Sequence, residues 1–330
     1  MAFVTIRRAA AAAVIAVLCA VAHPSAATAQ GSVNPTASSV KEQQLLDALK
    51  PDQRLSGRVS IPDPGASSLI QPEGRQFRAE RDQNARIGGL AILGMRGLLV
   101  LFYVVRGKVR MDGGRSGTTI TRFGFVERFT HWLTAVSFLL LGLTGLNITF
   151  GRALVLPLIG PQAFTSLSQA GKFVHIYVSF AFALGILLMF LLWVKDNLPA
   201  LRDIRWFLQG GGLIGLGHPP ADRFNAGQKL IFWSVVLGGG AIAVTGYILM
   251  FPFAWTDIAG MQWASVWHGL IGAVLFAVIL AHIYIGSVGM EGAIDAMGSG
   301  EVDVNWAKEH HSIWTERELG KAGKGAAPAE

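Results

Sequence analysis

Cysteine is almost absent from this chain of 330 residues, and the only one, Cys19, lies in an N-terminal stretch that we expect to be removed. The mature chain therefore has no means of forming a disulfide, a thiolate metal site or a C-x-x-C-H haem attachment. Charged residues are also scarce, at 15% of the chain, where about 25% is typical of soluble proteins. Together these shortages exclude a disulfide-stapled domain and argue against an ordinary soluble one.

Apolar residues make up 52% of the chain, and the mean hydropathy is +0.44. Forty glycines and nine tryptophans fit a helical membrane protein, in which glycine is enriched and tryptophan marks the interfaces. The net charge of +7 is explained by basic loops at the membrane surface, so we expect contact with membrane lipid and not with nucleic acid.

The first 29 residues have the pattern of a signal peptide. Arg7 and Arg8 precede a short apolar run, and Ala27-Thr28-Ala29 matches an A-x-A cleavage site. An uncleaved amphipathic anchor is the alternative. Residues 30–86 are polar and contain several prolines, so we expect a mostly irregular extracytoplasmic segment with one short helix near Val40–Leu49.

Five apolar stretches are each close to the roughly 20 residues that a helix needs to cross a bilayer. They lie at about 87–105, 130–150, 173–194, 230–251 and 266–288. We therefore predict an all-α membrane protein, a transmembrane helical bundle with a four-helix core and one extra N-terminal span. The predicted organisation is an extra helix at 87–105, a basic connection at 106–129, the core at 130–288 and a tail at 289–330.

The basic residues predict the orientation, because lysine and arginine are concentrated in cytoplasmic loops. Two connections hold many of them: Arg106, Lys108, Arg110, Arg115, Arg122 and Arg128 in one, and Lys195, Arg202, Arg205, Arg223 and Lys229 in the other. The remaining two connections hold only Arg152 and Lys172. We expect a bacterial inner-membrane protein with a periplasmic mature N-terminus and a cytoplasmic tail.

Four of the eight histidines fall inside predicted spans, namely His131, His175, His268 and His282. The last two share one helix and are fourteen residues apart, which puts them about 21 Å apart along the axis and on nearly one face. The other four, His23, His218, His310 and His311, are expected to be removed with the signal peptide or to be solvated.

Sorted by depth, the four histidines form two level pairs, His175 with His268 on the outside and His131 with His282 on the inside. Two six-coordinate b-type haems require this arrangement, with two neutral imidazoles from different helices at each iron. Histidines with purely structural hydrogen bonds are the alternative. Zinc would need three or four ligands at one depth, and a proton-relay transporter would need carboxylates in mid-span, which the sequence lacks. Arg96, near the middle of the first span, has no role that the sequence defines.

Several motifs resemble one family, the cytochrome b (gamma) subunits of membrane-bound respiratory formate dehydrogenases. They are RFTHW at 128–132, GKFVH at 171–175, NAGQK at 225–229 followed by IFWS, the two-histidine fifth span, and WAKEHH at 306–311. The resemblance covers roughly residues 120–315. Hydrogenase and thiosulfate or polysulfide reductase cytochrome b subunits share the histidines more than the NAGQK loop.

The resemblance implies that His131, His175, His268 and His282 ligate two haems. It also implies an iron–sulfur beta subunit and a molybdenum- or tungsten-containing alpha subunit that oxidises formate outside the membrane. Electrons would then reach a quinone beside Asn225, Gly227 and Gln228, so that the chain is the quinone-reducing subunit of an oxidoreductase in formate respiration. A nickel–iron hydrogenase or sulfur-compound reductase cytochrome b, a haem-free anchor or permease, and a simple polar turn at 225–229 are the alternatives.

Overall fold

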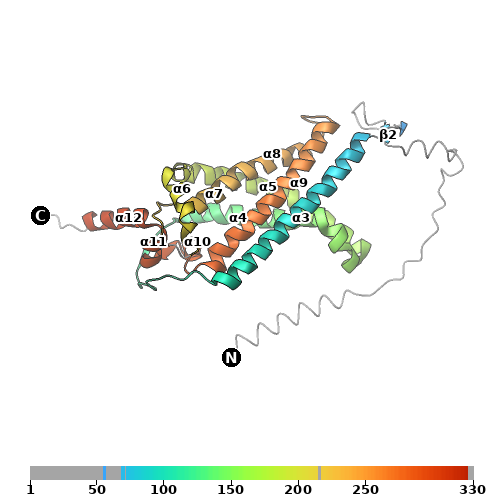
Figure 1. Cartoon of the computed structure of the whole chain (residues 1–330). Coiled ribbons are helices and arrows are strands. Elements are labelled where there is room, and N and C mark those ends of the chain that lie inside the picture. The colour runs from blue at the N-terminus through green and yellow to red at the C-terminus, as the bar shows by residue number, and fades with distance from the viewer. Residues whose placement is uncertain (1–54, 57–67, 71, 215–216, 326–330) are drawn as a thin grey trace. The chain divides into compact units, whose positions relative to one another are not determined.

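The computed structural model describes residues 55–56, 68–70, 72–214 and 217–325 (Figure 1). The predicted signal peptide at 1–29 and the predicted helix near Val40–Leu49 lie outside these residues. The chain forms two compact units, residues 1–78 with 146–173, and residues 79–145 with 174–330.

Five helices are long and apolar enough to cross a membrane, as the sequence predicts. The first three are α3 (Pro72–Arg106), α4 (Phe125–Leu154) and α5 (Leu156–Trp193). The fourth consists of α7 (Ala226–Trp233), a π-helix (Ser234–Gly238) and α8 (Gly239–Met250). The fifth consists of α9 (Ile258–Tyr284) and a π-helix (Ile285–Gly289). The predicted all-α membrane fold is thereby confirmed.

Shorter elements lie between and after these spans. The strands are β1 (Leu55–Ser56), β2 (Ser68–Ile70), β3 (Thr119–Thr121) and β4 (Glu301–Asp303). The short helices are the 3-10 turns Lys195–Asn197 and Gly210–Gly212, α6 (Leu201–Leu208), α10 (Asp295–Gly298), α11 (Val304–His310) and α12 (Ser312–Gly325). β1 pairs with β2, and β3 pairs with β4, both antiparallel.

The first span begins earlier than predicted. Residues 72–86 were expected to be irregular, but α3 starts at Pro72 and is continuous to Arg106. Proline is well suited to the first position of a helix. No further proline follows it, and the next turns contain several glutamate, glutamine and arginine residues, which are good helix formers. The helix therefore extends beyond the apolar stretch at 87–105.

Within the unit that contains residues 146–173, the expected loop at 151–172 is largely helical. α5 starts at Leu156, and its only non-helical residue is Gly160, with φ 78°. Pro161 follows, so α5 consists of two helical stretches that meet at a kink formed by a positive-φ glycine and a proline. Asn147 Nδ2 on α4 donates to Ser168 Oγ on α5 across 3.2 Å.

In the other unit, α3 packs along α9 (Figure 1). Asn84 Nδ2 donates to the backbone oxygen of Val266 at 3.1 Å, and the rings of Phe102 and Tyr284 meet edge-on with centroids 6.2 Å apart. A Cβ at Gly88 would lie 2.7 Å from that of Ala273, so only glycine permits this approach. Arg96 is exposed.

The C-terminal segment is folded and not a solvated tail. β4 pairs with β3 in the register Ile120↔Val302. Trp306 and Trp314 are buried in a core that also contains Phe123, two residues before α4, and Trp193 from the end of α5. The expectation that His310 and His311 are solvated is wrong, because they are only 8% and 0% exposed.

Candidate functional site

Two histidine pairs lie in the bundle, each made from two helices. His175 on α5 faces His268 on α9, with ring centroids 6.1 Å apart, and His131 on α4 faces His282 on α9, also at 6.1 Å. These are the partners that the depth of each histidine in the sequence predicts. The structure thus brings together all four predicted residues, two by two, at two levels of one helix.

The spacing within each pair fits a single iron between the rings. A metal–nitrogen bond of about 2 Å for each imidazole, plus roughly 1.1 Å from nitrogen to ring centre, gives centroids about 6.2 Å apart. Rings in edge-to-face contact also meet at such distances, and what favours a metal is that the same spacing recurs at both levels of α9. The residues present therefore fit a bis-histidine haem at each pair.

Hydrogen bonds define the tautomer of the His175–His268 pair. Thr144 Oγ1 donates to the backbone oxygen of Leu140 at 2.7 Å, so its oxygen accepts from His175 Nδ1 at 2.8 Å. His268 Nδ1 donates to the backbone oxygen of Ile242 at 3.0 Å. Thr245 Oγ1 lies 3.1 Å from the same nitrogen. Both Nδ1 atoms therefore carry the proton, and both Nε2 lone pairs are left for a metal.

In the His131–His282 pair, such support is missing at His131. The Nδ1 atom of His131 is buried and has no hydrogen-bond partner among the described residues. The two histidine pairs therefore have the same ring spacing but differ in the hydrogen bonds made by the Nδ1 atoms.

An apolar layer separates the two levels. Phe138, Phe182 and Leu275 each lie one heptad from a histidine on the same helix, and each is at most 8% exposed. The rings of Phe138 and Phe182 are 5.9 Å apart. A heptad of helix rises about 10.5 Å, so this layer lies midway between the histidine levels.

Glycines keep space around the His175–His268 pair. A Cβ at Gly145 would lie 3.6 Å from His175 Cε1, and a Cβ at Gly246 would lie 3.1 Å from His268 Cε1. Around Gly272, one turn after His268, nothing lies within 4 Å. A flat macrocycle needs such small side chains and open space beside its axial ligands.

The predicted quinone residues form the start of α7. Asn225 Oδ1 accepts from the backbone nitrogen of Gln228 at 2.9 Å, and Gln228 Oε1 accepts from that of Asn225 at 3.1 Å. This reciprocal capping box is the structural role that the sequence left open for the 225–229 turn. Both side-chain amide nitrogens remain as donors. A Cβ at Gly227 would lie 3.1 Å from Trp206, so a larger residue would have to displace that ring by a few tenths of an ångström.

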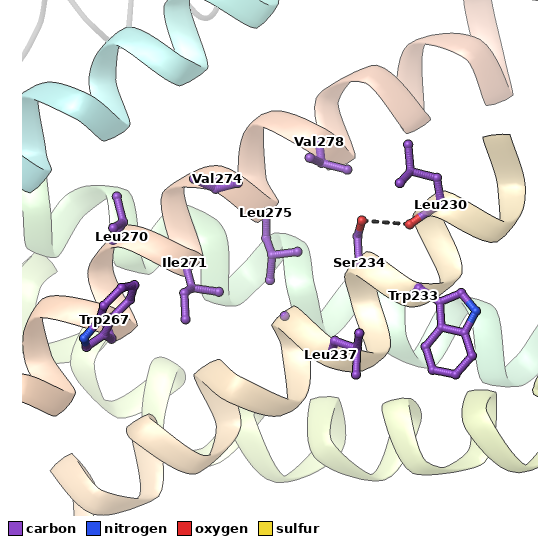
Figure 2. A pocket seen from close by; sticks show the side chains of 11 residues that line it. Leu230, Trp233, Ser234, Leu237, Trp267, Leu270, Ile271, Val274, Leu275 and Val278 are labelled. Carbon is purple, nitrogen blue, oxygen red and sulfur yellow. Dashed lines mark hydrogen bonds between the residues drawn. The ribbon is translucent and has the colours of Figure 1, made fainter. Parts of the chain in front are cut away.

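An apolar groove of about 500 Å³ starts close to this cap and lies between α9 and the fourth span (Figure 2). Its wall from the fourth span includes Leu230, Trp233 and Leu237, the last within the π-helix. Its wall from α9 consists of Trp267, Leu270, Ile271, Val274, Leu275 and Val278. Ser234 Oγ donates to the backbone oxygen of Leu230 at 2.7 Å, so no free hydroxyl faces the groove. The groove is therefore lined almost entirely by apolar side chains and suits a hydrocarbon chain.

A buried polar network near the start of α4 was not predicted. Arg122 Nη2 donates to the backbone oxygen of Arg223 at 2.6 Å and to His311 Nε2 at 3.0 Å. His311 Nδ1 in turn donates to the backbone oxygen of Asp222 at 2.8 Å. The Arg122 guanidinium also lies over the rings of Phe123, Trp306 and Trp314. The WAKEHH motif was the sequence signal for this network, although its role was not inferred.

Burial changes the acidity of this network. It lowers the pKa of Arg122 to about 9, with the charge of Arg223 adding to the effect. It also lowers the pKa of His310 to about 4 and holds the pKa of His311 well below its usual value. His218, predicted to be solvated, is partly exposed and pairs with Asp112 at 2.9 Å. Among the described residues no group of three or more His, Cys, Asp or Glu side chains could hold a metal ion.

Known proteins resemble this chain over the region that contains the site. A family model described as prokaryotic cytochrome b561 matches residues 122–300, which include all four histidines and the α7 cap. The cytochrome b556(Fdn) subunit of the nitrate-inducible formate dehydrogenase of Escherichia coli strain K12 is 32% identical over 208 residues. The match covers 62% of this chain and 93% of that subunit.

Two further relatives give the same picture. The formate dehydrogenase cytochrome b556(fdo) subunit of the same strain is 30% identical over 201 residues, 59% of this chain and 92% of the subunit. The formate dehydrogenase cytochrome b556 subunit of Haemophilus influenzae is 29% identical over 211 residues, 61% of this chain and 84% of the subunit. The resemblance that the motifs indicated is confirmed, and α3 precedes the residues that the family model matches.

Proposed function

The chain belongs to the prokaryotic cytochrome b561 family, and from that premise we propose that it is the di-haem subunit through which a formate dehydrogenase passes electrons to quinone. Membership of a cytochrome b family implies b-type haem, and the named relatives imply further subunits in a complex. The five apolar helices make the chain a multi-pass membrane protein.

One observation carries the proposal: two histidine pairs on different helices, each with ring centroids 6.1 Å apart. His175 and His268 would hold one haem, and His131 and His282 the other. Bound haem supplies a one-electron carrier at each level. The protein's part is to supply neutral imidazoles, to exclude water with the layer around Phe138 and Phe182, and to hold the two levels apart.

The basic connections support the proposed orientation, with the His175–His268 level outside and the His131–His282 level inside. An iron–sulfur beta subunit, fed by a molybdenum- or tungsten-containing alpha subunit, would donate electrons on the outer side of the bacterial inner membrane. The periplasmic N-terminus, the cytoplasmic C-terminus and the domain boundaries predicted from the sequence are part of this proposal.

Quinone would accept two electrons and two protons near the start of α7. The free amide nitrogens of Asn225 and Gln228 are donors suited to quinone carbonyl oxygens, and Gly227 lets the backbone come close. The 225–229 segment is connected to basic loops that face the cytoplasm in this orientation, and these loops give protons a short path. Reduction on this side would move negative charge inward and help build a membrane potential.

A reduced-minus-oxidised spectrum of the purified full chain, with haem extracted and counted per polypeptide, tests the proposal. We expect a b-type α band and two haems. A spectrum without that band would favour the haem-free anchor or permease. Co-purification separates the family-level alternatives, because a molybdopterin subunit that reduces dyes with formate supports a formate dehydrogenase, and a nickel subunit supports a hydrogenase.

A further inference from the structure

The two histidine pairs differ in what holds the nitrogen that does not face the metal. On His175, Nδ1 donates to Thr144 Oγ1 at 2.8 Å. On His268, Nδ1 donates to the backbone oxygen of Ile242 at 3.0 Å, with Thr245 Oγ1 at 3.1 Å. On His131, Nδ1 is buried with no partner among the described residues. At the His175–His268 level both Nδ1 protons have acceptors, whereas His131 at the other level has no acceptor for its Nδ1 proton among the described residues.

Thr144 and Thr245 can act only as hydrogen-bond acceptors toward the imidazoles of His175 and His268. Thr144 gives its own proton to the backbone oxygen of Leu140 at 2.7 Å, and Thr245 gives its proton to that of Ala241 at 2.8 Å. A hydroxyl has one proton, so each threonine oxygen can act toward its imidazole only as an acceptor, and the N–H of His268 is shared between Thr245 Oγ1 and the Ile242 carbonyl. The helix backbone thus orients each hydroxyl toward its histidine.

We propose that Thr144 and Thr245 are positioning residues that make the outer haem level harder to reduce than the inner one, and so direct electrons inward. The inference rests on the proposed function and deepens it. An imidazole whose N–H is donated to an acceptor is a more basic ligand, and a more basic ligand favours the ferric state. One electron moves from the outer to the inner level, no bond forms or breaks, and each Nδ1 keeps its proton.

The two threonines are expected to differ in how strongly they affect the outer reduction potential. Each ring also has a backbone carbonyl as a partner, Leu141 for His175 and Ile242 for His268. Thr144 Oγ1 lies closer to its histidine, at 2.8 Å, than Thr245 Oγ1 does, at 3.1 Å. The structure therefore predicts an ordered series in which Thr144→Val has the larger effect and Thr245→Val the smaller one. Thr144→Ser restores the hydroxyl and should restore the wild-type value.

The experiment is a potentiometric measurement of the haem absorbance in the purified full chain. His131→Ala, which keeps only the outer pair, assigns the two components. Thr144→Val should shift the outer reduction equilibrium about tenfold toward the reduced form, which is 59 mV for one electron. Thr245→Val should shift it less, and the inner component should stay in place in both variants. Thr144→Ala is measured in parallel in case valine disturbs the packing of the helix.

The outcomes separate this inference from the proposed function. A wild-type chain without haem would overturn both. A chain that keeps two haems in Thr144→Val and Thr144→Ala, with the outer potential unchanged, would overturn this inference alone. An equal shift of both components, or a shift that serine does not reverse, would show a general change in the bundle and would also overturn it.

Discussion

Arg122 and His311 are joined across 189 residues of sequence by a buried hydrogen bond of 3.0 Å between Nη2 and Nε2. Because arginine can only donate, Nε2 of His311 must be the acceptor, and its Nδ1 proton goes to the backbone oxygen of Asp222. The C-terminal helices are therefore tied to the residues that precede the α7 cap.

Removing His311 should loosen the C-terminal segment. His311→Ala leaves one Nη2 proton of Arg122 and the Asp222 carbonyl without partners, while Arg122 keeps its bond to the Arg223 oxygen, and each unsatisfied group costs roughly 1–3 kcal/mol. His311→Gln can accept with its oxygen and donate with its nitrogen, and it should recover most of that loss. Hydrogen exchange of the α11 amides measures the effect. Equal protection in the alanine variant and the wild type would contradict this role.

Acid should destabilise the same segment. In the folded protein the pKa of His310 is about 4 and the pKa of His311 is well below its usual value. In the unfolded chain both histidines have the ordinary pKa of about 6.5. The unfolded state therefore binds more protons below pH 6.5, and stability falls as pH falls, by about 1.4 kcal/mol per pH unit for each histidine. For His310 the loss continues to about pH 4.

Limited proteolysis of the C-terminal segment at pH 7.5 and pH 5 checks this expectation. The wild-type segment should be cut faster at pH 5. The double variant His310→Gln/His311→Gln, which has no imidazole to protonate, should show a much smaller difference between the two pH values. The same acid sensitivity in the double variant would assign it to other groups.

The layer between the histidine levels should matter for stability more than for haem binding. Phe182 is 3% exposed and packs against Phe138. Phe182→Ala removes a large buried ring, and such changes typically cost about 3–5 kcal/mol. We expect a lower midpoint for thermal loss of the haem spectrum, with two haems still bound at low temperature. Leu184→Ala, two residues further along α5 and 51% exposed, is the control that should change little.

Asn225 allows its two roles to be separated. Asn225→Ala removes both the cap and the amide donor, and the lost cap alone should cost about 1 kcal/mol. Asn225→Asp keeps an oxygen that accepts from the backbone nitrogen of Gln228 but has no amide nitrogen to offer a quinone. If the quinone assignment is right, the aspartate variant should fold normally and yet slow haem reoxidation by quinone at least about tenfold, the loss of one hydrogen bond to substrate. Normal reoxidation in the aspartate variant would leave Asn225 as a cap only.

The histidine pairs could be predicted because depth in a membrane is nearly a linear function of sequence. Each apolar span has one length and one direction, so His175 and His268 had to be level, and so had His131 and His282. The spacing of two heptads between His268 and His282 then placed both rings on one face. No tertiary information beyond the bilayer was needed.

Other features depend on contacts that a single sequence does not display. WAKEHH reads as a charged tail, yet Trp306 and His311 are buried, because β4 pairs with β3 and places them against Phe123. The glycines where the π-helix meets α8 also depend on such contacts. A Cβ at Gly238 would lie 2.9 Å from Leu275, and one at Gly239 would lie 2.7 Å from Ile186, so the neighbouring helices leave little room for a side chain there.

The ratio of haem to polypeptide in four single variants, His131→Ala, His175→Ala, His268→Ala and His282→Ala, tests the central claim most directly. We expect each variant to retain one haem of two. His175→Ala and His268→Ala should lose the same spectral component, and His131→Ala and His282→Ala should lose the other. Two haems retained in any of these variants, or components lost in a different pairing, would contradict the assignment of one haem to each histidine pair.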